Sequence, residues 1–473
     1  MAQFYPKLSA LLQEVHALKQ DVSAVDAKAL LMDLLVKKHY WPYLQIKYFG
    51  NESSLILLHN VYRQNVPISD MELYDECRSV VLDMNAPEGE NIILSLSKKI
   101  PIRMDVEKFE EIPCDTIRMY EMGYEGTMIY VYYHLDKWYM STSTCPSVDR
   151  SRYFNPNKSH GEMMDEVLQN LFPEIEQSEE QMYMEHSKDL RDKLCANLDT
   201  SQTYNFLLVH HENGCLMNAN YTELFGANYS MLFHLSSRNR QTMTETFEPV
   251  PALEALGIKY TVKFPTKAIM NVYIRDTQPG IYAVIAHTDS ILYKVSSREI
   301  LEKEEQTHGH PNPWVNLIWI YMQNKPHLRM EDYIQNNPTE LQKVADSAGA
   351  LISPARVVAK VMTTIRDILF SLYRTTTFYY KSTNTYRMNR ELDQTLPPIL
   401  RFHLAQLRHL QITYHNTQPL TRHAIHHYLC HHQTMKNIRL LVDAFTNNHS
   451  ICPMDTQSAD CFTILYRSLR GRQ

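Results

Sequence analysis

The chain has 473 residues, a length typical of two or three domains. Its 44% apolar and 21% charged residues are an ordinary globular balance, which excludes disorder, collagen and a coiled rod as the main state. Only 12 residues are glycine, and the sequence contains neither a P-loop nor a dinucleotide-binding fingerprint, so a glycine-rich phosphate cradle is not expected. The eight cysteines form no CxxC pair, which favours free thiols in a reducing compartment.

Charge is unevenly distributed along a chain whose formal net charge is −6. Residues 351–473, the C-terminal block, hold 15 Lys/Arg against 6 Asp/Glu, whereas residues 1–350 hold 32 against 47. This asymmetry predicts a polyanion partner for the C-terminal block, with docking of the block on its own acidic body as an equal alternative. No apolar run approaches the length of a membrane span and the first 20 residues lack a secretory pattern, so no membrane partner is expected.

The first half of the chain changes from helical to strand patterning. Apolar residues at helical spacing predict helices over 8–18 and 26–38. From about residue 55 to 297, short alternating runs predict strands over 127–133 and 138–144, joined as a hairpin by a four-residue loop, and further strands over 204–210, 280–286 and 291–297. A helix is expected near 162–171.

Helical patterning dominates after residue 297. Prolines predict the starts of helices over 354–374, 398–411 and 419–432, and a fourth helix is expected over 434–445. The sequence therefore predicts an α+β protein with three parts: an N-terminal helical segment (1–54), a strand-rich domain (55–300) and a basic all-α domain (301–473).

Four short segments occur in a recognisable order. They are Glu76–Asp83 (ECRSVVLD), Ser97–Lys99 (SKK), Tyr124–Ile129 (YEGTMI) and Thr203–Val209 (TYNFLLV). Their order and spacing resemble the RNA ligase branch of the covalent nucleotidyltransferases, of the phage T4 RNA ligase 1 type. They resemble still more the RNA ligase-like proteins of large nucleocytoplasmic DNA viruses, of the African swine fever virus type. Later segments agree, namely Gln278–Ile281, Tyr293–Val295 and the basic stretch 422–445.

The resemblance implies an ATP-grasp-like ligase core with antiparallel sheets, and it implies a chemistry. In the family a lysine attacks the α-phosphate of ATP and holds AMP, carboxylates hold Mg²⁺, and cations clamp phosphate oxygens. ATP and Mg²⁺ are therefore the expected cofactors if the chain is active, and none is expected otherwise.

The family's Lys-x-x-Gly spacing places Gly126 at the motif glycine and Gly123 at the nucleophile. No lysine occurs between residues 118 and 133, and Leu207 and Pro279 stand where the family has glutamates. The lysine-adenylate step is therefore predicted to be lost or altered. A misalignment, a lysine supplied from elsewhere such as Lys98 or Lys99, and catalysis without a covalent step stay open.

The surviving motif positions are candidates for binding a nucleotide or phosphate. They are Arg78, Lys98, Lys99, Glu125 and Lys294. Each has a simpler alternative: an ion pair of Arg78 with a nearby aspartate, solvated charge at the two lysines, turn geometry at Glu125, and a solvent-facing Lys294.

Aromatic and basic residues interleave between residues 370 and 390. Cations bind phosphates and aromatic faces stack on unpaired bases, so RNA contacts are predicted for Arg374, Lys381, Arg387 and Arg390. Phe370 and Tyr373 are expected in the core instead. The resemblance suggests a role of this domain in recognising tRNA-like RNA.

His423, His427 and His431 fall on one helical face, a spacing that can chelate a transition metal. No acid or second cysteine completes a known pattern, so no metal site is predicted.

Three functions follow from the sequence. The first is a divergent RNA ligase-like viral protein that binds RNA with its ligation step lost or altered. The second is an active ATP-dependent RNA ligase with a relocated lysine, and the third is a non-catalytic virion or scaffold protein. The resemblance implies the host cytoplasm, at the viral factory, with packaging in the virion as a further option; the sequence names no protein partner.

Overall fold

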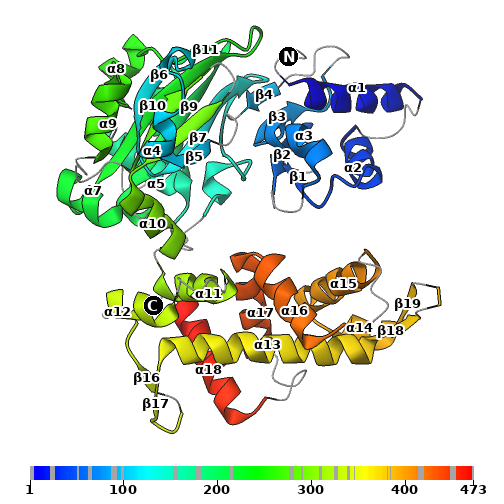
Figure 1. Ribbon diagram of the computed structural model, residues 1–473. Coiled ribbons are helices and arrows are strands. Elements are labelled where there is room, and N and C mark those ends of the chain that lie inside the picture. The colour runs from blue at the N-terminus through cyan, green and yellow to red at the C-terminus, as the bar shows by residue number, and fades with distance from the viewer. Residues whose placement is uncertain are drawn as a thin grey trace. The chain divides into compact units, whose positions relative to one another are not determined.

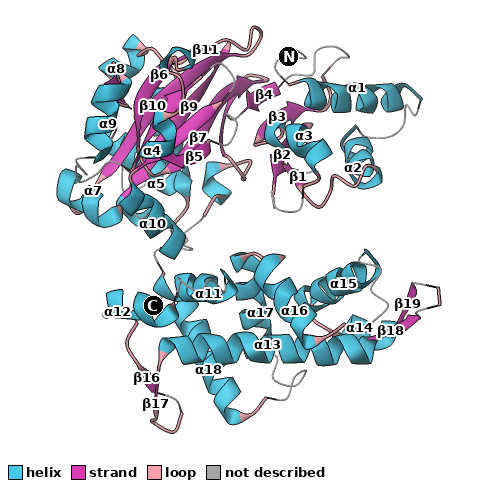
Figure 2. Ribbon diagram, viewed as in Figure 1, coloured by secondary structure: helices cyan, strands magenta, loops and turns pink. Residues whose placement is uncertain are grey.

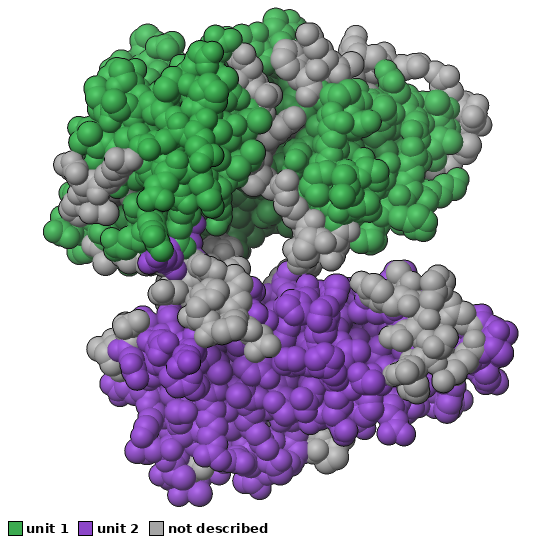
Figure 3. Space-filling view, in the orientation of Figure 1, with its two compact units in different colours: residues 1–301 green, residues 302–473 purple. Residues whose placement is uncertain are grey.

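We analysed a computed structural model of the chain (Figure 1). The structure describes residues 5–21, 27–50, 53–61, 66–86, 93–96, 101–152, 158–175, 183–213, 217–275, 282–288, 291–307, 312–323, 329–337, 341–345, 347–380, 382–383, 385–413, 420–447 and 454–470. The chain divides into two compact units, residues 1–301 and 302–473, coloured separately in Figure 3. Unit 1 combines antiparallel sheets with helices and unit 2 is mainly helical (Figure 2), which confirms the α+β class with a helical C-terminal region.

The N-terminal part of unit 1 is a four-stranded sheet under three helices. The sheet has the order β1 (Leu44–Tyr48), β2 (Leu55–Asn60), β3 (Val80–Asp83) and β4 (Ile93–Leu96). Its helices are α1 (Pro6–Asp21), α2 (Ala27–Lys37) and α3 (Met71–Glu76). They bury leucines such as Leu8, Leu31 and Leu58 in one apolar cluster. The two predicted N-terminal helices are present, but β1 lies inside the stretch that was expected to be helical, because its apolar residues pair with β2.

A six-stranded sheet forms the centre of unit 1. Its path is β11 (Glu245–Thr246), β10 (Ser230–Asn239), β9 (Gln202–His210), β7 (Thr127–His134) and β8 (Lys137–Thr142), and β12 (Lys259–Tyr260) pairs with β10. The predicted hairpin is present as β7–β8. Its connection is a two-residue turn rather than the expected four-residue loop, since Leu135 and Asp136 both adopt positive φ (45° and 59°), as a tight primed hairpin turn requires.

The two faces of this sheet carry different partners. One face packs Ile129, Val131 and Phe206 against α5 (His160–Leu171) and α6 (Tyr183–Cys195). On the other face, Tyr130 and Tyr132 join a cluster with leucines of β2, which ties the N-terminal sheet to the centre.

A five-stranded sheet completes unit 1. Its order is β13 (Lys263–Phe264), β6 (Met119–Gly123), β14 (Ala283–His287), β15 (Leu292–Ser296) and β5 (Ile102–Asp105). The strands predicted over 280–286 and 291–297 are present as β14 and β15, which pair with each other. Its apolar face packs against α4 (Val106–Glu110) and α9 (Lys267–Arg275). The remaining helices of this region are α7 (Asn218–Phe225), α8 (Pro251–Ala255) and α10 (Arg298–Thr307).

Unit 2 packs helices around the 23-residue α13 (Pro354–Thr376), drawn in yellow in Figure 1. The other helices are α11 (Pro313–Gln323), α12 (Met330–Asn336), α14 (Arg390–Thr395), α15 (Pro398–Thr413), α16 (Arg422–His431), α17 (Met435–Asn447) and α18 (Thr456–Arg470). Two small hairpins are β16–β17 (Val344–Ala345, Leu351–Ile352) and β18–β19 (Thr377–Tyr380, Thr385–Met388). The α16 helix begins at Arg422, three residues after the expected start, because Thr421 caps it through its side chain. Among the described residues, no helix combines the length and apolarity that a membrane crossing demands.

Candidate functional site

The motif residues lie on all three sheets of unit 1. Gly123 ends β6 and Lys294 lies on β15 of the five-stranded sheet, Leu207 lies in the middle of β9 of the six-stranded sheet, and Arg78 lies just before β3 of the N-terminal sheet. Lys98, Lys99, Pro279 and Lys381 lie outside the described residues.

Gly123 is buried and closely packed. A Cβ placed there would lie 3.2 Å from the carbonyl oxygen of Ala283 and 3.2 Å from Cγ1 of Ile285, so any side chain would require those neighbours to move. At Gly126 the constraint is stronger, because a Cβ would lie 2.4 Å from the carbonyl oxygen of Leu208. Gly126 thus allows the backbone to approach β9 closely.

Leu207 belongs to an apolar cluster on the face of the six-stranded sheet opposite α5 and α6. It is 6% exposed and lies between Met128 of β7 and Phe233 of β10 in the strand register. Tyr124, which follows β6, stacks on Phe233 with ring centroids 4.5 Å apart, and Tyr282 packs on the same cluster. An apolar side chain in this setting cannot hold a cation.

The second face of the five-stranded sheet carries buried polar side chains among apolar ones such as Ile285. Strand register puts Glu121, Gly123, His287, Lys294 and Ser296 on this face, opposite the face that packs on α4 and α9. Glu121, His287, Lys294 and Ser296 are each less than 9% exposed.

Lys294 faces the interior and not the solvent. Its Nζ lies 3.6 Å from the centroid of the Tyr282 ring. This cation–π contact is shielded from water, because Lys294 is buried. Because Tyr282 also packs on the cluster around Leu207, the polar face of the five-stranded sheet looks toward the six-stranded sheet. Lys294 therefore lies on the face that looks toward the six-stranded sheet, two strands away from Gly123, because β14 separates β15 from β6.

A buried acid–histidine pair lies on the same face. His287 Nε2 and Glu121 Oε1 are 2.6 Å apart, and the Thr261 hydroxyl donates to Glu121 Oε2 at 2.7 Å. Phe247 covers the imidazole edge-on at 5.0 Å. With both carboxylate oxygens bonded and the ring covered, the pair fastens β6 to β14.

Glu125 is fixed by the turn in which it lies. Its carboxylate Oε2 accepts a hydrogen bond from the backbone N–H of Met217 at 3.1 Å, and its own N–H donates to the Tyr221 hydroxyl at 2.7 Å. These contacts fasten the β6–β7 turn to the start of α7, which supports the alternative of turn geometry for Glu125.

Arg78 is half-buried at the turn from α3 into β3. The following residue, Ser79, is buried and adopts a left-handed conformation with φ of 62°. At the end of β3, Asp83 accepts from His134 Nε2 at 2.7 Å. Burial acts to raise the pKa of Asp83, but hydrogen bonds from Ser54, the backbone of Asn85 and His134 outweigh it and lower the pKa.

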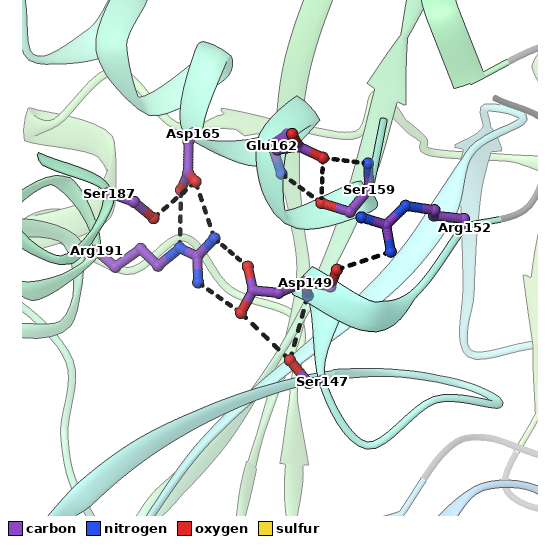
Figure 4. Close-up of polar contacts among 8 residues, drawn as sticks. All are labelled: Ser147, Asp149, Arg152, Ser159, Glu162, Asp165, Ser187 and Arg191. Carbon is purple, nitrogen blue, oxygen red and sulfur yellow. Dashed lines mark hydrogen bonds and ion pairs between the residues drawn. The ribbon is translucent and has the colours of Figure 1, made fainter. Parts of the chain in front are cut away.

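A cluster of ion pairs lies on the side of the six-stranded sheet that α5 and α6 cover (Figure 4). Arg191 of α6 bonds Asp165 of α5 through Nε at 2.8 Å and Asp149 through Nη2 at 2.7 Å. Burial acts to lower the pKa of Arg191, but the two aspartates outweigh it and raise the pKa. A Cβ at Gly161 would lie 2.3 Å from Asp149 Oδ1, so this glycine gives the ion pairs their room. The cluster is a structural clamp.

One group in the described part of the chain has metal-ligand geometry. His210, His211 and Glu212 bring one ligand atom each within 4.8 Å of one another. His210 Nδ1 accepts from the Glu212 backbone N–H at 3.2 Å, so Nε2 carries the proton and donates to Glu166 at 2.9 Å. The Lys158 ammonium contacts both Glu166 and Glu212. The protein's own cation thus occupies the acidic pair, which argues against a metal here.

Two of the histidines on α16, His427 and His431, lie close together. The rings of His427 and His431 have centroids 4.4 Å apart. They are not among the described groups of three or more ligands with metal-binding geometry. Burial and the neighbouring imidazoles lower the pKa of His427.

In unit 2, the predicted RNA-contacting arginines are exposed. Arg374 lies in the last turn of α13 with its guanidinium 5.7 Å from the Phe370 ring centroid, Arg387 lies on β19, and Arg390 is the first residue of α14. Tyr373 is 5% exposed, as expected for a core residue. Phe370 is half-buried: it packs against the apolar core as expected, and the guanidiniums of Arg374 and Arg422 flank its ring.

Two features escaped sequence reasoning. Arg408 of α15 is buried and bonds Asp393, Thr376 and Thr377. The Glu121–His287 pair joins residues 166 positions apart. Nothing local in the sequence marks either, although the HLAQLRHL pattern places Arg408 next to an apolar helix face.

Comparisons with known proteins place the chain only loosely. No protein-family model matches it, and no curated protein matches it. Among solved structures, a protein of Aquifex aeolicus assigned as an ATP-dependent DNA ligase is similar over 65% of this chain and 69% of that chain, with 11% identity and a TM-score of 0.34. An archaeal ATP-dependent RNA ligase is similar over 74% of this chain and 82% of that chain, also with 11% identity and a TM-score of 0.34. At these values neither likeness carries an argument about function.

Proposed function

We propose that the chain is a ligase-like protein that binds RNA through unit 2 and does not form a lysine adenylate in unit 1. The observation that carries the proposal is the packing at two motif positions. A Cβ at Gly123 would crowd the Ala283 carbonyl oxygen and the Ile285 side chain at 3.2 Å, and Leu207 lies in an apolar cluster with Phe233 and Tyr124. A covalent nucleotidyl transfer needs a nucleophile and a metal-holding carboxylate at these positions.

The charges of the two units support the same division of roles. In unit 1, Lys294 lies against the Tyr282 ring, and the Glu121 carboxylate is bonded to His287 and Thr261. In unit 2, Arg387 and Arg390 are exposed to solvent within a block of positive charge. Exposed cations of this kind bind phosphates with strong salt dependence.

A working ligase with a relocated lysine is the second candidate, and Lys294 is the described residue that favours it. Lys294 is a buried lysine on the face of the five-stranded sheet that looks toward the six-stranded sheet, and a covalent nucleotidyl transfer needs a lysine nucleophile. In that case ATP and Mg²⁺ would be the cofactors. The sequence resemblance is the sole support for two further parts of the proposal, location in the host cytoplasm and packaging in a virion.

A self-adenylylation assay separates the two candidates. The full-length protein is incubated with ATP labelled at the α-phosphate and with Mg²⁺ or Mn²⁺, then denatured, with an active ligase alongside. We expect no retained label. An acid-labile label that disappears in Lys294→Met would overturn the first candidate in favour of the second. A label that survives in Lys294→Met would overturn both assignments and would be located by peptide mapping.

A further inference from the structure

The β18–β19 hairpin has one face made only of exposed side chains. Strand register pairs Phe378 with Arg387 and Tyr380 with Thr385, so these four side chains lie on the same face of the two-stranded ribbon. All four are exposed, and the aromatic rings are 55% (Phe378) and 49% (Tyr380) exposed. The packing of unit 2 does not explain why two large aromatic side chains on one short ribbon are exposed to this extent.

The base of the hairpin is held in place from inside the bundle. The Arg408 guanidinium, 3% exposed, donates to Thr376 Oγ1 at 3.0 Å, to Thr377 Oγ1 at 2.9 Å and to Asp393 Oδ1 at 2.7 Å. It also contacts Met388 Sδ, at the end of β19, at 3.0 Å. An isolated two-stranded hairpin is only marginally stable in water. The hydrogen bonds of the buried Arg408 therefore hold the ribbon as a rigid platform.

The charge around the platform is mainly positive. Arg387 lies on the exposed face itself, and Arg374 and Arg390 lie just before and just after the hairpin in the chain. Of the two acids on α14, Asp393 is neutralised by Arg408, which leaves the exposed Glu391. Figure 1 shows the ribbon extending from its end of the helical bundle, beyond α14.

We propose that this face binds unpaired nucleotides of RNA, with bases stacked on Phe378 and Tyr380 and phosphates held by Arg387. The inference rests on the proposed RNA-binding function and specifies its substrate as single-stranded segments. Aromatic faces accept any base, whereas in a duplex the bases already stack on one another. A protein partner on the same aromatic face is the competing occupant, but the arginine opposite Phe378 and the two flanking arginines favour a polyanion.

The test compares the full-length protein with Phe378→Leu/Tyr380→Leu, which keeps apolar side chains but removes both π-faces. Binding to a single-stranded RNA and to a duplex of equal length is measured at one fixed salt concentration. We expect about 100-fold weaker binding of the single strand, since each stacked base contributes roughly a factor of ten, with duplex binding changed far less. Phe402→Leu, on an exposed aromatic of α15, is the matched control and should leave both affinities unchanged.

A second variant reports stacking directly. In Phe378→Trp, addition of single-stranded RNA should quench the added indole fluorescence, measured as the difference from wild type. Wild-type protein that binds no RNA would overturn the proposed function and this inference with it. Wild-type protein that binds RNA, with a folded double variant of equal affinity and no quenching in Phe378→Trp, would overturn the hairpin site alone.

Discussion

The two units use the same charged residue types in opposite ways. In unit 1, charged and polar groups turn inward: Arg191 clamps two aspartates, Glu121 binds His287, and Lys294 lies over an aromatic ring. In unit 2, Arg387 and Arg390 face solvent, and Arg408 is the described arginine there that is buried. The contrast shows that burial, and not residue type, decides whether a cation stabilises the fold or is available to a ligand.

The largest expected effect is the loss of stability when Arg191, the cation of the ion-pair cluster of unit 1, is replaced. Arg191→Met would leave Asp149 and Asp165 without their cation, and removal of one partner of a buried pair costs about 3–5 kcal/mol. Denaturant unfolding of the variant measures the loss. Lys193→Met, two residues further along α6, removes the exposed pair with Glu174 and a cation–π contact with Phe172, and should cost about 1 kcal/mol. Equal losses in the two variants would contradict the structural role assigned to Arg191.

A slightly smaller loss of stability is expected when the buried arginine of unit 2, Arg408, is replaced. Arg408→Met leaves Asp393 buried without its cation and should cost about 3 kcal/mol. Because Arg408 also holds the base of the β18–β19 hairpin, the variant should lose affinity for single-stranded RNA even when it is still folded. Arg401→Met, an exposed position on the same helix, is the control for both readouts. Stability at the wild-type value would show that Arg408 does not anchor the hairpin.

The smallest of these effects depends on pH. Burial lowers the pKa of His403 to about 4, below its ordinary value of about 6.5. The unfolded chain therefore binds a proton that the folded chain does not, so stability falls as the pH drops below about 6.5 and levels off near 4. Between pH 7.5 and 5.5 the loss for this one group is about 1 kcal/mol.

The check for His403 is a difference between two pH values. His403→Gln should lessen the pH dependence of the unfolding free energy by that amount, whatever its absolute cost from the lost contact with the Tyr428 hydroxyl. Burial lowers the pKa values of His59 and His234 of unit 1 to about 4 as well, so these histidines also destabilise the fold on acidification. An unchanged pH dependence in His403→Gln would refute this assignment.

Much of the fold could be predicted from periodicity, because hydrophobic spacing is a local signal. The β7–β8 hairpin and the helices α5, α13 and α15 lie where the patterns placed them. The strands β1 and β10 were not predicted, since LQIKY is short and the Ser230–Asn239 strand is interrupted by polar residues that bond within the sheet.

The site was harder to predict than the fold, since it depends on contacts between distant residues. The sequence placed Lys294 among the candidates for binding a nucleotide or phosphate, but only the structure shows Tyr282 against its ammonium. It gave Arg387 and Arg390 as exposed cations but could not tell them from Arg408, because nothing in the chain order says which arginine turns inward.

The contrast between the units is tested most directly by RNA binding of Arg387→Glu/Arg390→Glu as a function of salt. The account predicts that wild-type affinity falls steeply with salt. In the double variant, affinity should fall about tenfold or more and the slope should be smaller by roughly 1.4, since each phosphate contact on a single strand contributes roughly 0.7. Thermal unfolding should be unchanged, because both side chains are exposed. A folded double variant with wild-type affinity and slope would contradict the claim that unit 2 offers its cations to RNA.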